Sequence, residues 1–493
     1  YSASTSTSAT TTPGYVPAAT AALTNISAAT IGMHATATAQ GTSAAAAGAM
    51  LVNGIQQDAL APGGVGSVTL TNSGNITIDA TAKAPIAAAA VSSTGLAPAA
   101  VVLGEDQAQA QAIVVGAIAQ NTGYSFGFGE DDGEDQPAGA LTTPGSRNAT
   151  LTNNSGAAIA VNANATAGTS GVPVGDAQAQ ALVLGGVVQG PVAEGFLNVL
   201  GEDGLLGEDG LQPGDLAGLL GGGMVQFSAD ELAPAALPAG VIGVSDVVTN
   251  AGTLTFGANA QAFATGAATA TAGALGIIQG EVANNVSLTL TNSGTINVPV
   301  VASATGNDAF SAGIGIGSVQ FAVATGAGTA ADPAQADAAF TNSGTYKIDV
   351  KSTSTGVNDA DSIAIAMGSV QAATGLKGTL SFNNSKDYSV TGTAKSTVSA
   401  TAPTGTADAY AAAVGYVAFA DEGVAVSAAN SGNFTVLADA SGSGSAQAAA
   451  AGMVIFGSNG LPVTTGTPDT PVTVTNSGTI AVTNQDGSPS GSL

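Results

Sequence analysis

Thr-Asn-Ser-Gly at positions 71–74, followed by the strand-like run Asn-Ile-Thr-Ile at 75–78, is the stretch of this sequence that determines the fold. The same tetrapeptide returns at 291–294, 341–344 and 475–478, each time before another β-rich run. Weaker copies stand at 154–156, 249–252, 384–386 and 430–432. A turn-plus-strand unit that recurs in this way predicts a repeated structural module.

The copies are spaced at regular intervals along the chain. The last residues of the turns are 74, 156, 252, 294, 344, 386, 432 and 478, so the gaps are 82, 96, 42, 50, 42, 46 and 46 residues. The five later gaps define a unit of 42–50 residues. Each of the first two gaps is about twice as long and holds either a degenerate copy or an insertion. A further copy without its turn opens the chain at 23–26.

The motif has the chemistry of a chain reversal followed by a strand. Glycine adopts positive φ without steric cost, and asparagine tolerates the left-handed region and bonds its own backbone. After the turn, Ile76 and Ile78 alternate with Thr77 and Asp79. This period of two predicts a strand with one face buried.

Each unit has a second half, in which a glycine introduces an Ala- and Gly-rich segment, as at 104–110 and 306–310. Alanine is the best helix former, so runs such as 43–50 could be helical. Glycine and β-branched residues interrupt nearly every such run, which favours strands. With at least two β segments and two reversals per unit, we interpret each unit as a pair of coils. That interpretation gives roughly twenty coils and a body on the order of 100 Å long.

The composition suits a thin stacked core. Hydrophobic residues make up 45% of the chain, but aromatics are only 4%, tryptophan is absent and glycine numbers 69. Stacked β coils bury small residues in layers about 4.8 Å apart and need few aromatics. The sequence therefore predicts an all-β fold, an elongated parallel β-helix (solenoid) of 42–50-residue repeats. The alternative is antiparallel β-hairpin repeats that form a sandwich or a propeller, although variable gaps favour a solenoid with side loops.

The charge balance excludes several classes of function. The formal net charge is −26, and charged residues are 8% of the chain, far below the usual quarter. Nucleic acid binding needs Lys and Arg along the phosphate backbone, so it is not expected. No stretch offers 18 uninterrupted apolar residues, so we expect no transmembrane helix. The absence of cysteine excludes a disulfide framework and Cys-ligated zinc.

Two acidic, Gly-rich stretches look like insertions, one near 129–137 and the other near 201–215. Closely spaced carboxylates in such loops suit Ca²⁺, which takes six to eight oxygen ligands. Neither stretch matches the Asp-x-Asp-x-Asp-Gly loop or the Gly-Gly-x-Gly-x-Asp repeat, so solvated acidic loops are the competing interpretation. Calcium is the one cofactor that the sequence suggests. The candidate ligands are Asp131, Asp132, Glu134, Asp135, Glu202, Asp203, Glu208 and Asp209.

Five of the seven basic residues fall in one span of the chain. Such a face could pair with the acidic loops of a neighbouring subunit. Alternatively, lysines on exposed sheet positions protect sheet edges against aggregation. The five residues are Lys347, Lys351, Lys377, Lys386 and Lys395.

We do not expect an enzyme. A Ser-His-Asp triad would need His34, the only histidine, and no Gly-x-Ser-x-Gly turn lies near it. Carboxylate pairs can hydrolyse glycosidic bonds, but aromatic platforms and basic residues are scarce here. A polysaccharide-acting β-helix enzyme is the alternative, and its signature would be a groove of carboxylates with Tyr124, Phe126 or Phe128.

We divide the chain into three parts. Residues 1–20 are expected to be a flexible or strand-exchanging arm, 21–485 the solenoid with its acidic insertions, and 486–493 a C-terminal tail. The chain begins at Tyr1 without a methionine or a basic leader region, which we interpret as a mature product whose signal peptide has been removed.

The runs at 472–480 and 288–298 resemble the repeats in passenger regions of bacterial autotransporters and haemagglutinin-like adhesins. That resemblance implies a right-handed parallel β-helix exported to the cell surface. The chain departs from the pattern in two ways: its unit is interpreted as two coils, and it lacks the aromatic-rich strands of a translocator barrel. The resemblance therefore implies either that the barrel was removed or that export uses another route.

The sequence as a whole predicts an extracellular structural repeat protein, a self-assembling surface fibre or filament subunit or an adhesin stalk. Neither terminus shows an amphipathic capping helix, and uncapped coils favour stacking of one subunit on the next into a homopolymer. Surface polysaccharide or a host or neighbouring cell surface is the further partner class. A calcium-stabilised surface-layer or adhesin protein is the alternative within this class.

Overall fold

The computed structural model describes residues 18–41, 44–59, 65–85, 107–122, 145–170, 175–190, 241–324, 334–399, 405–420, 423–457 and 471–487. These residues form 28 strands, and none of them lies in a helix. Consequently the described residues contain no helix that is long and apolar enough to cross a membrane. The predicted all-β class is confirmed.

Three sheets form the body, and every strand pairing among the described residues is parallel. The first sheet contains β1 (Ala18–Asn25), β5 (Val65–Asn72), β9 (Gly145–Asn153), β12 (Val241–Asn250), β15 (Asn285–Asn292), β18 (Gln335–Asn342), β21 (Lys377–Asn384), β24 (Val424–Asn430) and β27 (Val472–Asn476). The second contains β2 (Thr30–Thr38), β6 (Asn75–Ala84), β10 (Ala158–Ala167), β13 (Thr253–Phe263), β16 (Thr295–Thr305), β19 (Thr345–Gly356), β22 (Asp387–Val398), β25 (Asn433–Ser441) and β28 (Thr479–Gly487). The third contains β3 (Ala44–Val52), β4 (Ile55–Asp58), β7 (Gln107–Val115), β8 (Ile118–Asn121), β11 (Asp176–Gln189), β14 (Ala267–Ala283), β17 (Asp308–Ala324), β20 (Asp359–Thr374), β23 (Thr406–Ala420) and β26 (Ala446–Gly457).

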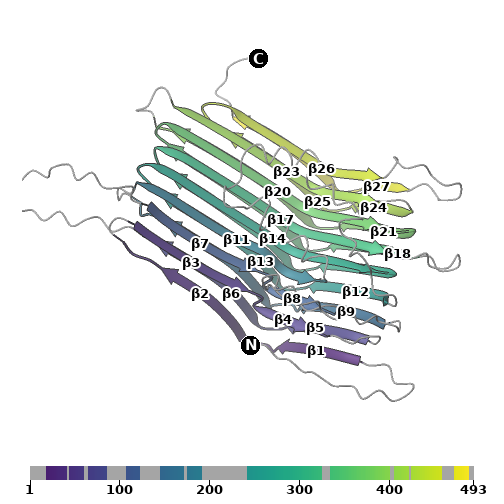
Figure 1. The fold of residues 1–493 in the computed structure, drawn as a ribbon. Helices are drawn as coiled ribbons and strands as arrows, with labels where there is room; N and C mark the ends of the chain where they lie inside the picture. The colour runs from purple at the N-terminus through teal and green to yellow at the C-terminus, as the bar shows by residue number, and fades with distance from the viewer. Residues whose placement is uncertain are drawn as a thin grey trace, which may run out of the picture.

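The chain visits the three sheets in turn and then rises to the next coil, so the fold is a parallel β-helix (Figure 1). The coil with β1, β2 and β3 lies at one end of the stack. At the other end, β26 closes the eighth coil, and the ninth coil consists of β27 and β28 among the described residues. The alternative of antiparallel hairpins in a sandwich or propeller is wrong for the described residues, because strands of successive repeats pair side by side in parallel.

Each sequence unit makes one coil, not two. Asn292 pairs directly with Asn342, and Asn342 with Asn384, so adjacent copies of the motif lie on adjacent coils. The nine coils of the described residues therefore rise by only about 40 Å, and the two-coil interpretation with its length of about 100 Å is wrong. The two reversals of a unit do not make two coils, because the second reversal, as at Gly306, leads into a single strand of up to 17 residues such as β17, which closes the same coil.

The two long gaps between motifs are insertions, since no coil is hidden in either. Asn72 pairs with Asn153, and Asn153 with Asn250, across gaps of 81 and 97 residues. The turnless copy at the start is also a true coil, because Asn25 pairs with Asn72. The acidic stretch near 129–137 falls between β8 and β9, and the one near 201–215 falls between β11 and β12. Both therefore lie in connections from the third sheet to the first. Both stretches lie outside the described residues.

The strands of the third sheet fold back over both of the other sheets. Their first halves cover the second sheet, as the bond between Ser311 and Ser352 shows, and their second halves cover the first sheet, where Gln371 donates to the Ala338 carbonyl. A glycine marks the bend in each long strand. A Cβ at Gly368 would lie 2.0 Å from Tyr388 Oη, so the absence of a side chain makes room for the ring.

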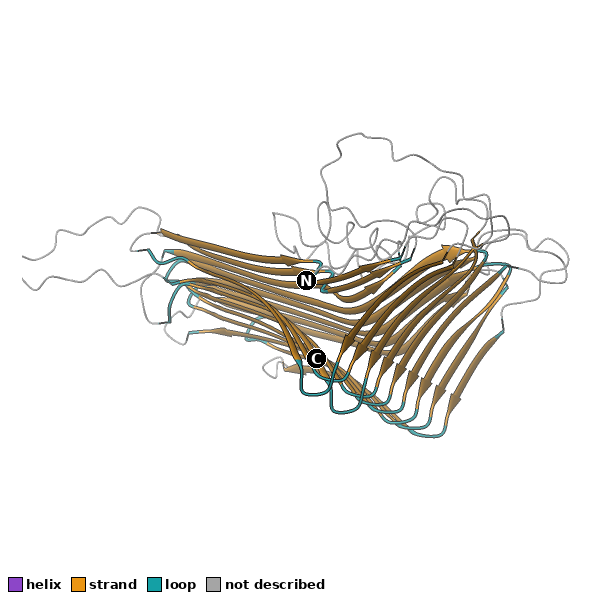
Figure 2. Ribbon diagram, turned by 90° about the horizontal axis from the view of Figure 1, so that it is seen from below, coloured by secondary structure: helices purple, strands orange, loops and turns teal. Residues whose placement is uncertain are grey.

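The motif glycine is needed for close stacking of the turns. Gly294 and Gly344 are not among the glycines with positive φ, which corrects the dihedral argument made from the sequence. A Cβ at Gly344 would lie 2.1 Å from the carbonyl oxygen of Gly294 on the coil below. Figure 2 shows the turns of successive coils stacked in rows along the body.

Small side chains fill the interior, as the composition predicted. Columns of alanine run up the second sheet, for example Ala80, Ala163 and Ala258. Aromatics fill the space where the third sheet bends. The rings of Tyr346 and Tyr388 stack with centroids 4.8 Å apart, and Phe434 continues the stack at a further 4.8 Å. A narrow core of this kind positions two polar columns, and no described residue covers the core side chains at either end of the stack.

Candidate functional site

A column of asparagines runs the whole described length of the stack on the inner side of the motif turns. In each coil the asparagine Nδ2 donates to Oδ1 of the asparagine on the next coil, at 2.7–2.8 Å. The same Nδ2 also donates to a backbone carbonyl on the next coil, as Asn342 does to Asp387 O at 3.1 Å. The members are Asn25, Asn72, Asn153, Asn250, Asn292, Asn342, Asn384, Asn430 and Asn476.

A second column, of glutamines, runs between the third and first sheets with the opposite direction of donation. Gln320 Nε2 donates to Gln279 Oε1 at 2.8 Å, and Gln371 Nε2 donates to Gln320 Oε1 at 2.7 Å. The column starts at Gln57 and ends where Tyr416 Oη donates to Gln371 Oε1 at 2.6 Å. The sequence carries a signal for this column that we did not use: Gly-Ser-Val-Gln occurs at both 317–320 and 368–371.

The asparagine column gives the stack a chemical direction that continues to its ends. At the last described coil, Asn476 accepts from Asn430, is exposed, and donates to the Gly478 carbonyl of its own turn at 3.2 Å, which leaves its second amide hydrogen without an acceptor among the described residues. At the first coil, Asn25 donates to Asn72, and no described residue donates to Asn25 Oδ1. One end of the column therefore presents a donor, and the other presents an acceptor.

The C-terminal end of the stack leaves core positions open. Val472 and Val474 are 51% and 52% exposed, although their in-register neighbours Val426 and Ala428 are buried. Ile480 and Val482 are 39% and 43% exposed, whereas the equivalent Phe434 and Val436 are fully buried. These four side chains point into the coil, and among the described residues nothing lies on top of them.

The N-terminal end repeats this arrangement. Leu23, Ile31 and Met33 occupy interior positions of the first coil and are only partly buried. Their equivalents one coil further along, Leu70, Ile76 and Ile78, are fully buried. Both ends are thus apolar strand edges with unpaired backbone groups, the feature that makes sheet edges pair with other chains.

The outer face of the first sheet is rich in hydroxyl and amide groups and carries a groove of ≈ 420 Å³. Asn148, Ser245, Ser287 and Asp337 line it as one in-register row across four strands. Gln335 Nε2 donates to Asp337 Oδ2, and the buried Oδ1 of Asp337 has no partner among the described residues.

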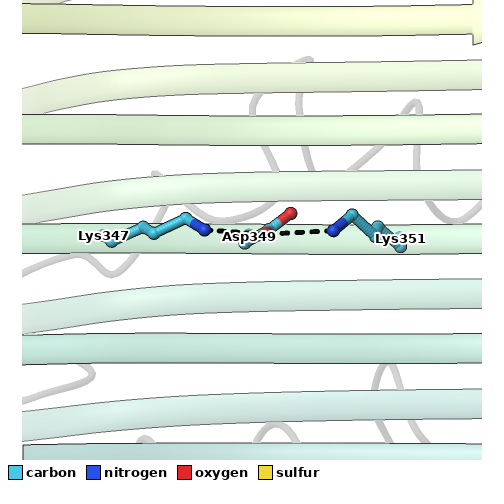
Figure 3. Close-up of polar contacts among 3 residues, drawn as sticks. All are labelled: Lys347, Asp349 and Lys351. Atoms are coloured by element: carbon cyan, nitrogen blue, oxygen red, sulfur yellow. Dashed lines mark hydrogen bonds and ion pairs between the residues drawn. The ribbon is translucent and has the colours of Figure 1, made fainter.

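The lysines predicted to form a face lie in the middle of the sheets. Lys347 and Lys351 flank Asp349 on β19, with Nζ to Oδ2 distances of 3.0 and 3.2 Å (Figure 3). β19 is the sixth strand of the second sheet, and Lys377 opens the seventh strand of the first. Protection of sheet edges is therefore wrong as an explanation for these lysines, because none of these strands is an edge.

A pair of acids lies inside the fourth coil. Asp246 and Glu281 are 0% and 1% exposed and stand at positions that the next coil fills with Leu288 and Ala322. Burial raises the pKa of Asp246 to about 7, and burial together with the Asp246 charge raises the pKa of Glu281 well above its ordinary value. The positive charge of Arg147 on β9 opposes the rise at Glu281. No motif in the sequence indicates that these two acids form a pair.

The predicted calcium ligands, at 131–135 and 202–209, lie outside the described residues. Within the described ranges, no group of three or more acidic or histidine side chains could hold a metal ion. Carboxylates of neighbouring coils lie side by side near the start of the third-sheet strands. Asp361 on β20, for example, is in register with Asp408 on β23. Burial, followed by the charges of Asp408 and Asp359, raises the pKa of Asp361.

Among the described residues, the groups that the enzyme hypothesis would need do not come together. His34 Nδ1 lies 3.3 Å from Asp79 on the outer face of the second sheet. The described lining of the groove contains one carboxylate, Asp337, whereas glycoside hydrolysis uses two. Tyr124, Phe126 and Phe128 lie outside the described residues. Asp246 and Glu281 are enclosed in the core, out of reach of a polymer.

No protein-family model, curated protein or solved structure matches the chain. The candidate site therefore rests on the geometry of the described residues, and its most distinctive part is the pair of open ends.

Proposed function

We propose that this protein is a structural subunit that is displayed outside the cell and assembles end to end into a fibre. The observation that carries the proposal is the exposure of core side chains at the last coil, with Val472 and Val474 half exposed at positions that are buried in the coil below. A resemblance to exported surface repeats at 472–480 supports the location.

The energetics favour a partner at these ends. Burying a valine, leucine or isoleucine side chain contributes about 1.5–3 kcal/mol when burial is complete. Val472, Val474, Ile480 and Val482 gather on one end of the molecule, and Leu23, Ile31 and Met33 on the other. Covering both ends would bury these side chains and also satisfy the unpaired N–H and C=O groups of the edge strands.

The net charge controls when assembly occurs. A formal charge of −26 makes like subunits repel one another, and the repulsion is screened over about 10 Å at 0.1 M salt. We therefore expect assembly to strengthen as ionic strength rises. Calcium would promote it beyond this screening only if the acidic stretches bind the ion.

The test is negative-stain electron microscopy and light scattering of the purified chain in NaCl, MgCl₂ and CaCl₂ at matched ionic strength. We expect fibres in all three salts, in larger amounts at higher ionic strength. Particles that stay monomeric in every salt contradict the proposal. Fibres, or a raised melting temperature, in calcium alone would favour the calcium-stabilised surface-layer alternative.

A second candidate function is the binding of surface polysaccharide on the outer face of the first sheet. The specific observation is the groove of ≈ 420 Å³, along which the in-register row of Asn148, Ser245, Ser287 and Asp337 supplies amide, hydroxyl and carboxylate groups that can hydrogen-bond to sugar hydroxyls. Binding to a glycan array, lost in Asp337→Ala and retained in the opposite-face variant Thr391→Ala, would support it. Equal binding by both variants would count against this groove.

A further inference from the structure

We propose that subunits join head to tail and in register. The first coil of one copy lies on the ninth coil of the preceding copy and takes the place of a tenth coil. The inference rests on the proposed end-to-end assembly and specifies the partner surface, its direction and its alignment. The partner is a second copy of this chain.

The apolar positions match when the register of the stack is continued across the joint. Every first-sheet strand ends at a column asparagine, so Asn476 would face Asn25 of the next copy, and Val474 would face its Leu23. In the second sheet, Thr479 and Thr30 both open their strands at the same register position. This places Ile480 against Ile31 and Val482 against Met33, so partly exposed core side chains cover one another.

The direction of the asparagine column selects this orientation over the others. Asn476 has a second amide N–H besides the one that it donates to the Gly478 carbonyl, and Asn25 presents an Oδ1 with no donor among the described residues. The head-to-tail joint therefore completes the hydrogen bond that each neighbouring pair of coils makes. Two C-terminal ends would place donor against donor, and two N-terminal ends acceptor against acceptor. Strands also remain parallel only in the head-to-tail joint, as in every described pairing.

The joint can be tested by cysteine cross-linking, because the chain has no cysteine of its own. Thr475 and Thr24 are exposed neighbours of Asn476 and Asn25, so in the proposed joint their Cα atoms are adjacent, about 4.8 Å apart and within disulfide range. Within one molecule the two positions are eight coils apart, about 38 Å, so an intramolecular bond cannot form.

The experiment oxidises Thr24→Cys/Thr475→Cys, each single variant and the misaligned pair Thr20→Cys/Thr475→Cys, and reads the products by non-reducing electrophoresis. We expect a ladder of covalent multimers from the aligned pair and little product from the misaligned pair, whose positions are about 13 Å out of register. Dimers from a single variant would show like ends meeting and overturn the inference. Fibres by microscopy without any cross-link would also overturn it while leaving the proposed function intact; absence of fibres would overturn both.

Discussion

The side-chain amide of Asn342 donates to Oδ1 of Asn384 at 2.8 Å, and both side chains are completely buried. This single contact recurs between every neighbouring pair of coils in the described stack. It explains why all nine described strands of the first sheet end in asparagine, since a buried amide needs the same partner above and below.

Replacing one column asparagine should therefore cost more than the loss of one bond. Asn384→Ala leaves the buried Nδ2 of Asn342 and the Oδ1 of Asn430 short of a partner, at about 1–3 kcal/mol each. We expect a loss of at least about 2 kcal/mol in the free energy of unfolding, measured by urea denaturation. The matched control is the adjacent Asn383→Ala, which is exposed on the opposite face and should change stability by less than about 0.5 kcal/mol. Equal losses in the two variants would contradict the role of the column.

A side chain at the bend of the third sheet should destabilise the core by overpacking. A Cβ at Gly368 would lie 2.0 Å from Tyr388 Oη and 2.2 Å from the Gly415 carbonyl oxygen. We expect Gly368→Ala to lower stability by about 1–3 kcal/mol, with partial recovery when Tyr388→Phe removes the hydroxyl.

The control for that substitution is Gly48→Ala, because no atom lies within 4 Å of a Cβ built there. Thermal unfolding should show a melting temperature equal to or above that of the parent for this variant. If Gly368→Ala is tolerated as well as Gly48→Ala, the packing of Tyr388 into the bend is not as described.

The buried acids should make stability fall as the pH rises. Burial raises the pKa of Asp246 to about 7 in the folded protein, whereas an unfolded aspartate titrates near 3.9. Between these values the unfolded chain has lost the proton that the folded chain keeps, so stability decreases by up to about 1.4 kcal/mol per pH unit for this group and levels off above pH 7. The raised pKa of Glu281 acts in the same direction.

The neighbouring coil supplies the variant that tests this. Asp246→Leu/Glu281→Ala copies the residues Leu288 and Ala322 of the next coil. We expect urea denaturation of this variant to show higher stability than the parent at pH 8 and a flatter dependence between pH 4 and pH 7. The exposed, non-titrating variant Asn383→Ala should keep the parent's slope. An unchanged slope in the double variant would mean that the pair is not protonated in the fold.

A charge at the open end should prevent assembly without unfolding the subunit. Val474 is 52% exposed at the last coil, so Val474→Asp adds a carboxylate at the joint with little effect on the monomer. Light scattering should show the variant monomeric at an ionic strength where the parent forms fibres, and circular dichroism should be unchanged. Thr435→Asp, on the outer face of β25, is the control and should still assemble. Assembly of Val474→Asp at the parent's rate would place the joint elsewhere.

The sequence was sufficient to predict the class of fold because each repeat contains a recognisable turn motif at a regular interval. The spacing of Asn292, Asn342 and Asn384 marks one corner of each coil, and the period of two after each turn identifies the second sheet. The number of coils per unit could not be read in the same way. The two reversals of each unit, as at Gly294 and Gly306, are both real, but they separate strands of the same coil.

The sites were harder to predict because they depend on which positions face each other across the coil. Gln320 and Gln371 recur in a shared Gly-Ser-Val-Gln, yet only the register shows that they form a hydrogen-bonded column. Asp246 and Glu281 are 35 residues apart and become partners only when β12 and β14 close the same coil. The apolar ends of the described stack follow from the register of its first and last coils, and their complementarity comes from the direction of the asparagine bonds.

The axial repeat of the fibres tests the central claim most directly. Fibre diffraction or cryo-electron microscopy would measure both the spacing between strands and the repeat of the subunit along the axis. Nine coils stacked head to tail predict a continuous spacing of about 4.8 Å with a subunit repeat of about 43 Å. A subunit repeat near 100 Å, or strands that are not perpendicular to the fibre axis, would contradict the one-coil repeat and the in-register joint.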